Sequence, residues 1–351
     1  MMVTFKPWLD RLLGRGRSAL TVPPMDGALK PNNRLEEAPA GIHAAEPRSL
    51  ALQNGRVVWA EGCKIMSAEE EVASLSHPIT ALAVSPQGRM ALALDGRGIT
   101  LEGDELPALQ GATCVTAMAF EGETTLWVAV GSTVHPLGDW SRDFLEMRRS
   151  GQVLRYDIAN RTLTVAAERL GFPYGLLPTP QGLVISESWT RQLVRLDGTG
   201  RLTLLKDNLP GYPAGLAPAS GGGAWMALFA PCNPLLELVL RESEYRHAMM
   251  AEVEPEFWIA PALRSGYSFR EPMQGGALKQ MGILKPWAPT RSYGLVVQLS
   301  PEFIPLQSLH SRAGGKRHGI TAVLEHDAQL WAASTGGNEV LRLNVREGNH
   351  Q

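Results

Sequence analysis

The chain has 351 residues, of which 44% are hydrophobic and 19% charged, so its composition is globular and its length allows one large domain or two ordinary ones. Lys+Arg 33 against Asp+Glu 35 gives a formal net charge of -2, which argues against a nucleic-acid partner because such partners select a basic face. The three cysteines (Cys63, Cys114 and Cys232) are widely spaced and predict neither a disulfide framework nor a CxxC metal site, which favours a reducing, cytoplasmic location.

Residues 1–44 are predicted to form an extension that precedes the main domain. Apolar residues recur at helical spacing from Phe5 to Leu13, with arginines beside them, so we expect an amphipathic helix within residues 5–17. Two interpretations stay open, a helix that docks on a membrane surface or a protein partner and a helix that packs on its own domain. We expect no secretion signal, because charged residues interrupt every apolar stretch of this segment.

From about residue 45 onward, β-rich runs of four to seven residues alternate with turn residues, as in Ile79–Val84, Met90–Leu94 and Leu183–Glu187. A loose motif, Gly-x-Val-x-Arg-Tyr/Leu, recurs at Gly55, Gly151, Gln192, Gly294 and near Glu339. Roughly 310 residues divided into six units give about 50 residues each, the size of a four-stranded propeller blade. We therefore predict an all-β fold, a six-bladed β-propeller over residues 45–351.

Residues 233–290 interrupt the strand pattern. Leu235–Glu242 and Tyr245–Val253 have helical periodicity. This stretch is expected to form a partly helical insertion that caps one mouth of the propeller.

Several segments are similar, in the right order, to the strictosidine-synthase-like family. They are Pro23–Ala38, Gly151–Asp157, Leu170–Gly175, Val184–Ser188, Asn208–Pro213, Gly221–Ala227, Ser292–Leu299 and Ile320–Ser334. The resemblance implies a six-bladed propeller that is distantly related to gluconolactonases and paraoxonases. Those relatives hydrolyse lactones and esters with a Ca²⁺ ion in the central tunnel.

The resemblance also implies calcium ligands at four places, and this sequence departs from the family at each of them. The residues that stand there are Arg48, Thr116-Ala117, Tyr174 and Ala214-Gly215. A guanidinium has no lone pair for a cation and repels it, whereas Ca²⁺ prefers carboxylate and amide oxygens. We expect the family's calcium site to be lost and no other cofactor to replace it.

Strictosidine synthase itself uses a glutamate of the last blade, and Thr321 stands at the matching position here. A threonine hydroxyl does not exchange protons near neutral pH as a carboxylate does, so the Pictet–Spengler reaction is not expected. The remaining polar candidates are Glu187, His318 and Tyr174. Glu187 is either a general base or ligand anchor or the buried partner of Arg48, and His318 is either an acid/base or a solvated loop residue.

Trp140 belongs to a loop that borders the predicted mouth, or is an ordinary loop residue. Together with Arg48, Thr116, Ala214 and Thr321, it completes the predicted ligand-binding set. Two functions stay open. One is a propeller that binds a small organic molecule in its central tunnel, as a metal-independent hydrolase of lactone or ester type that uses Glu187 or His318 with Tyr174 as a polariser. The other is a non-catalytic binding or scaffold propeller, held near a membrane by its N-terminal helix and the insertion.

Overall fold

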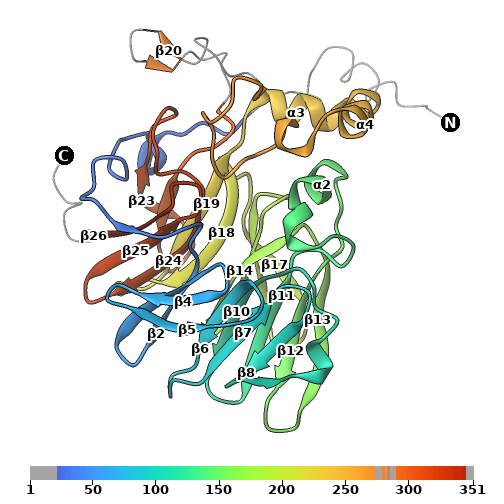
Figure 1. Cartoon of the computed structure of the whole chain (residues 1–351), viewed down its shortest axis with the longest axis vertical. Helices are drawn as coiled ribbons and strands as arrows, with labels where there is room; N and C mark the ends of the chain where they lie inside the picture. Colours follow the sequence, from blue (N-terminus) through green and yellow to red (C-terminus); the bar gives the residue numbers. More distant parts are fainter. Residues whose placement is uncertain (1–21, 273–278, 281–282, 285–289, 345–351) are drawn as a thin grey trace.

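Six antiparallel four-stranded sheets surround a central axis, which confirms the predicted six-bladed β-propeller (Figure 1). The computed structural model describes residues 22–272, 279–280, 283–284 and 290–344. The predicted N-terminal helix within residues 5–17 lies outside these residues. Among the helices of the described chain, none has the length and apolar character needed to cross a membrane.

Each blade runs from an inner strand at the tunnel to an outer strand at the rim. The first three blades comprise β2 (Arg48–Gln53), β3 (Arg56–Glu61), β4 (Lys64–Ser67) and β5 (Glu71–Ser74); β6 (Ile79–Val84), β7 (Met90–Leu94), β8 (Gly98–Leu101) and β9 (Asp104–Glu105); and β10 (Val115–Glu121), β11 (Thr125–Val130), β12 (Gly151–Asp157) and β13 (Thr162–Leu170). The fourth comprises β14 (Pro173–Thr179), β15 (Gly182–Glu187), β16 (Gln192–Leu196) and β17 (Leu202–Lys206).

The fifth blade comprises β18 (Gly211–Pro218), β19 (Ala224–Pro231), β22 (Leu295–Leu299) and β23 (Pro305–His310). The sixth comprises β24 (Ile320–His326), β25 (Gln329–Ser334), β26 (Glu339–Asn344) and β1 (Ile42–His43). Strands in the middle of a blade are covered on both faces by neighbouring blades, so they are continuous apolar runs such as β19, which is buried throughout. The recurring Gly-x-Val-x-Arg motif falls on the third strand of four blades but on the second strand at Gly55.

The ring is closed by strand β1, which comes from the start of the chain. Ile42 pairs with Val340 and His43 with Glu339, so β1 forms the outer strand of the last blade. The propeller therefore begins before residue 45, and the predicted boundary of the extension falls too late. Sequence patterns do not reveal this strand because its two residues are too few to show an alternation of apolar and polar side chains.

Arg317 fastens the segment that leads into β1. Its guanidinium donates to the carbonyl oxygens of Leu35 (2.6 Å), Ala38 (2.6 Å) and Pro39 (2.9 Å). It also pairs with Glu339 of β26, Nε to Oε2 at 3.0 Å, and its side chain is 10% exposed. One buried cation thus joins the N-terminal segment to the last blade through charge-assisted hydrogen bonds.

His310, at the end of β23, is buried under the same N-terminal segment. Its ring nitrogens contact the Tyr293 hydroxyl (3.1 Å) and the Ser308 hydroxyl (2.9 Å), and Ser308 donates to the carbonyl oxygen of Ala28 at 2.7 Å. Burial lowers the pKa of His310 to about 4 and raises the pKa of Tyr293 to about 12. The hydroxyl of Tyr293 therefore stays protonated and donates to a neutral imidazole at neutral pH.

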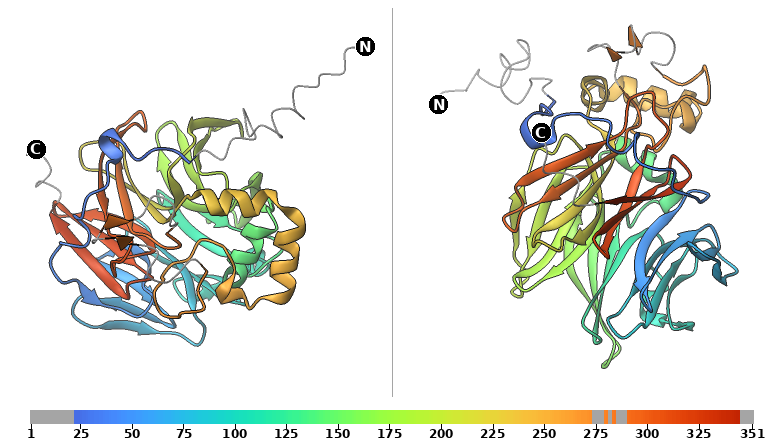
Figure 2. Two further views of the ribbon diagram at one scale, coloured as in Figure 1. Left: turned by 90° about the horizontal axis from the view of Figure 1, so that it is seen from above. Right: turned by 90° about the vertical axis from the view of Figure 1, so that its left-hand side faces the viewer.

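An insertion leaves the fifth blade after β19 and returns at β22. It carries α3 (Pro234–Arg241), α4 (Ser243–Glu252), η5 (Pro255–Phe257) and the strands β20 (Lys279–Gln280) and β21 (Ile283–Leu284). Asn233 caps the start of helix α3, since its side chain accepts a hydrogen bond from the Leu236 amide at 3.0 Å. Figures 1 and 2 show α3 and α4 on the same face of the propeller as α2 (Trp140–Leu145).

Replacing Arg317 tests the closure of the ring. Arg317→Met leaves Glu339 and three carbonyl groups without their partner, so the free energy of unfolding should fall by about 3–5 kcal/mol. Arg312→Ala is the matched control, because Arg312 is exposed on the same loop. Chemical denaturation measures both variants. Equal stability of Arg317→Met and wild type would show that the clamp does not hold the ring closed.

The buried imidazole predicts a pH dependence. His310 has a folded-state pKa of about 4 against an ordinary value of 6.5, so the unfolded chain takes up a proton first as the pH falls. The stability is present above pH 6.5 and is lost between that pH and about 4, by about 3 kcal/mol. His310→Gln should lack this loss, whereas His77→Gln at a half-buried loop position should keep it. Urea titrations at several pH values test it, and equal slopes for His310→Gln and wild type would contradict it.

Candidate functional site

Six backbone irregularities define the mouth of the tunnel. In every blade the pairing of the inner strand with its neighbour shifts register near the start of the inner strand. The residues skipped there are Ser49, Thr80, Thr116, Tyr174, Ala214-Gly215 and Thr321. A bulge redirects the side chain that it carries, so the propeller gathers one such position from each blade into a ring.

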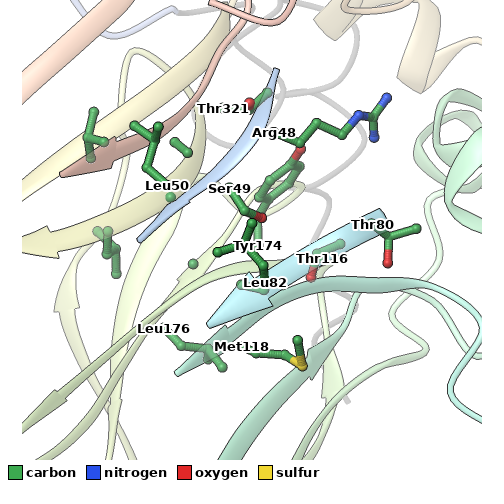
Figure 3. Close-up of a pocket in the computed structure, with 16 residues that line it drawn as sticks. Arg48, Ser49, Leu50, Thr80, Leu82, Thr116, Met118, Tyr174, Leu176 and Thr321 are labelled. Carbon is green, nitrogen blue, oxygen red and sulfur yellow. The ribbon is translucent and has the colours of Figure 1, made fainter. Parts of the chain in front are cut away.

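The tunnel inside this ring is narrow. A cavity of about 80 Å³ is lined by Arg48 and by the ring residues other than Ala214, with Leu82, Met118 and Leu176 below them (Figure 3). Pockets that bind organic ligands usually measure about 300–1,000 Å³, so this volume suits a few water molecules. The predicted ligand therefore does not fit inside the tunnel itself.

Two threonine hydroxyls of the ring, those of Thr116 and Thr321, are occupied by short hydrogen bonds. Thr116 Oγ1 donates to the carbonyl oxygen of Pro173 in the next blade at 2.6 Å. Thr321 Oγ1 contacts Thr335 Oγ1 at 2.5 Å, and Thr335 donates to the carbonyl oxygen of Pro47 at 2.7 Å. Both side chains line the cavity, where Thr116 binds the next blade directly and Thr321 is connected to the first blade through Thr335.

Tyr174, a ring residue, lies beside Arg48 (Figure 3). Burial raises the pKa of the Tyr174 hydroxyl, and the positive charge of Arg48 opposes that rise. The hydroxyl is therefore protonated at neutral pH, so it can donate a hydrogen bond but cannot act as a base.

Arg48 faces a second and larger space, which we call the mouth cleft. The mouth cleft measures about 620 Å³ and is lined by Ala45, Glu46, Arg48, Glu61–Lys64, Pro78–Thr80, Asp95, Leu137, Gly138 and Trp140. Figure 3 shows the guanidinium of Arg48 directed away from Leu82 and Leu176 at the bottom of the tunnel. Within the described part of the chain, no hydrogen bond or ion pair engages this guanidinium.

Trp140 forms one wall of the mouth cleft and is held in place by other aromatic rings. Its ring stacks on Trp189, with centroids 6.1 Å apart, and meets Phe229 edge-on at 5.6 Å. Leu263 of the insertion lies over the same aromatic rings. Its carbonyl oxygen would lie 1.8 Å from a Cβ atom at Gly336, so this close approach requires a glycine.

Glu187 does not pair with Arg48, and that interpretation is wrong. Glu187 is 1% exposed, and its carboxylate accepts hydrogen bonds from the Gly171 amide (2.6 Å) and from Gln192 (2.8 Å). Its ion-pair partner is Arg149, 3.7 Å away. The reason is positional, because Glu187 ends β15, the second strand of its blade, and lies one strand away from the tunnel.

His318 is neither a solvated loop residue nor a free acid/base. It is 2% exposed, and its ring nitrogens contact the Ser292 hydroxyl and the carbonyl oxygen of Arg312, both at 2.7 Å. A carbonyl oxygen can only accept, so Nε2 carries a proton and Nδ1 accepts from Ser292 in the neutral ring. His318 therefore holds in place the loop that connects the fifth blade to the sixth.

Ala214 is fully buried, and its carbonyl oxygen accepts a hydrogen bond from the Ser186 hydroxyl at 2.7 Å. Gly215 lines the cavity in its place. The side chains of Arg48, Thr116, Tyr174, Thr321 and Trp140 thus line the tunnel cavity or the mouth cleft, whereas those of Ala214, Glu187 and His318 line neither.

The side chains of the ring do not fit a calcium ion. The tunnel cavity is lined by hydroxyls, aliphatic groups and one guanidinium, and none of its described lining residues is a carboxylate or an Asn. Elsewhere in the described chain, no three His, Cys, Asp or Glu side chains form a group that would hold a metal ion. Calcium requires six to eight oxygen ligands, and a fixed positive charge opposes its binding.

The sequence analysis missed four residues near the mouth. They are Thr80, which lines the mouth cleft, and Trp189, Phe229 and Leu263, which lie behind Trp140. Thr80 was detectable, because the pattern apolar-Thr-Ala occurs at Ile79, Val115 and Ile320, each time placing the threonine on a bulge. The aromatic residues and Leu263 come from segments far apart in the sequence, and no local pattern links them.

The fold and the ring define this chain as a six-bladed β-propeller with a polar, arginine-bearing tunnel mouth. The resemblance to strictosidine-synthase-like proteins is confirmed. The chain is 25% identical over 214 residues to adipocyte plasma membrane-associated protein of Salmo salar, covering 59% of this chain and 45% of that protein. It is 27% identical over 217 residues to the Homo sapiens protein of that name, covering 58% and 46%. The chain thus spans about half the length of these curated relatives.

Two solved structures that share the fold are of enzymes. A gluconolactonase of Xanthomonas campestris superposes with a TM-score of 0.52 at 13% identity, covering 87% of each chain. A luciferin-regenerating enzyme superposes with a TM-score of 0.51 at 10% identity, covering 90% of this chain and 95% of that one. At these identities the likeness shows the fold alone. No family model matches the chain.

The donor set of the ring predicts indifference to calcium. A site with a Kd of about 10 µM would stabilise the folded protein by roughly 2.7 kcal/mol at about 1 mM Ca²⁺. We expect neither Ca²⁺ nor EDTA to move the melting temperature by more than about 1 °C. Differential scanning calorimetry measures this, and a rise of several degrees with Ca²⁺ that EDTA reverses would contradict the assignment.

Proposed function

We propose that this propeller binds a small organic molecule in the mouth cleft, without a metal ion. One observation carries the proposal: the Arg48 guanidinium faces a cleft of ligand size with no partner among the described residues. Guanidinium groups partly removed from water are normally paired, so an unpaired one at the wall of a cleft is a recognition element for a ligand. Trp140 adds a rigid apolar surface to the same cleft.

Binding is favoured over hydrolysis by the positions of the predicted catalytic residues. Glu187 and His318 lie outside the mouth with their polar atoms engaged, and Tyr174 is a hydrogen-bond donor. A metal-independent lactone or ester hydrolase is the enzymatic alternative, and the gluconolactonase-like fold makes lactones the first substrates to test. Association with a membrane through residues 5–17 and a cytoplasmic location stay predictions.

Filling the mouth cleft tests the proposal. Gly138 lines the cleft, and a Cβ atom there would meet no heavy atom within 4 Å, so Gly138→Trp should fold and occlude the cleft. Gly111→Trp is the matched control, because Gly111 has equally open surroundings and does not line the cleft. In a ligand-observed NMR screen of small organic fragments, Gly138→Trp should lose the binding that wild type and Gly111→Trp retain.

Two outcomes would contradict the proposed function. Fragment binding that survives in the folded Gly138→Trp protein would place the ligand site elsewhere. Turnover of a panel of lactones and aryl esters by wild type, lost in Gly138→Trp, would replace binding by hydrolysis at the same cleft.

A further inference from the structure

We infer that the ligand of the mouth cleft is an organic carboxylate that carries one negative charge and an apolar body. The inference rests on the proposed function and names the chemical class of the molecule that binds. It follows from three features of the cleft, namely the guanidinium at its inner end, the apolar wall beside it and the carboxylates among its other lining residues.

The guanidinium selects a carboxylate. It presents N–H donors in a planar fork that matches the two oxygens of a carboxylate group, so such a ligand binds through two parallel hydrogen bonds. The lining carboxylates Glu46, Glu61 and Asp95 do not compete, because none of them forms an ion pair with Arg48. Thr80, which lines both the tunnel and the mouth cleft, adds a hydroxyl whose contact with the carbonyl oxygen of Ala93 is long, at 3.4 Å.

The apolar body of the ligand has a defined place. Leu137, Ile79 and Trp140 give the mouth cleft its apolar wall. The space between Trp140 and the aromatic rings behind it measures only about 10 Å³, so no part of a ligand fits there. The ligand therefore lies against the cleft side of Trp140, with its carboxylate at Arg48.

The other charges of the cleft limit the ligand to one negative charge. Lys64, the second cation of the lining, is already paired with Glu71, Nζ to Oε2 at 2.6 Å. Glu46, Glu61 and Asp95 carry no ion pair, so a second negative charge on the ligand would face carboxylates and find no free cation among the described lining residues. Glu46 and Asp95 are exposed, and water and salt screen their effect on the direct contact at Arg48. A phosphate monoester is disfavoured because it carries this second negative charge.

Four probes of similar size separate these features: 3-phenylpropanoate, its neutral amide, 3-phenylpropylamine and phenethyl phosphate. Titrations followed by NMR should give wild type a Kd on the order of 1 mM for the carboxylate. The amide, the amine and the phosphate should each bind at least about tenfold more weakly. Gly138→Trp should abolish binding of the carboxylate.

The variants assign the discrimination to one side chain. In Arg48→Gln the acid and the amide should bind equally, and Arg48→Lys, which keeps the charge but not the fork, should lie between Arg48→Gln and wild type. Arg201→Gln, at an exposed position outside the cleft, is the matched control and should behave as wild type. Circular dichroism establishes that each variant is folded, and Arg48→Lys carries the test if Arg48→Gln is not.

Each other result has a definite meaning. Equal binding of the acid and the amide in wild type, blocked by Gly138→Trp, would overturn the carboxylate inference and leave the proposed function standing. Tighter binding of the phosphate would overturn the single-charge requirement. Binding of none of the probes at about 5 mM, or binding that Gly138→Trp does not affect, would overturn both proposals.

Discussion

The structure depends on closing a ring of six sheets, and the closing contact is made by a very short strand. Only two residues of β1 pair with β26, and two residues by themselves contribute few hydrogen bonds. Arg317 adds the rest, because its guanidinium connects three carbonyl groups of the N-terminal segment to Glu339 of β26. A propeller that is not closed exposes the edges of its first and last blades, so the arrangement of the inner strands depends on this clamp.

Closure also explains why the tunnel holds little chemistry of its own. The bulges of the six inner strands meet at one end of the tunnel, where polar side chains of neighbouring blades come within hydrogen-bonding distance. Thr116 and Thr335 use their hydroxyls to bind the next blade's backbone, and Ser186 does the same toward Ala214. Hydroxyls that hold blades together are not available to a substrate. Arg48 differs because its long side chain reaches past the ring to the mouth cleft.

The architecture could be predicted from the sequence because the strand pattern of one blade is repeated six times. Short apolar runs at intervals of about 50 residues define a propeller even where single strands are mispredicted. The four positions at which the family resemblance implied calcium ligands also map to the mouth, since each lies on or beside a bulge of an inner strand. The strand β1 was missed because two residues carry no periodicity.

The interactions of the site residues were predicted less well, for a physical reason. The pairing of Glu187 with Arg48 was inferred from two family positions, but Glu187 lies on a second strand, where Gly171, Gln192 and Arg149 surround it. His318 was expected to be either an acid/base or a solvated loop residue, yet Ser292, which follows the insertion in the chain, contacts its ring and buries it. Contacts of this kind depend on loops that meet only in the folded chain, so no local pattern records them.

A crystallographic screen with small organic carboxylates, carried out in a buffer that contains Ca²⁺, tests carboxylate binding at Arg48 and the absence of calcium binding in one experiment. We expect electron density for a ligand in the mouth cleft, with its carboxylate on the guanidinium of Arg48 and its apolar part on Trp140. We also expect no ion in the tunnel beneath them. A cation coordinated by the ring residues, or ligands that bind elsewhere and leave the mouth cleft to water, would contradict these expectations.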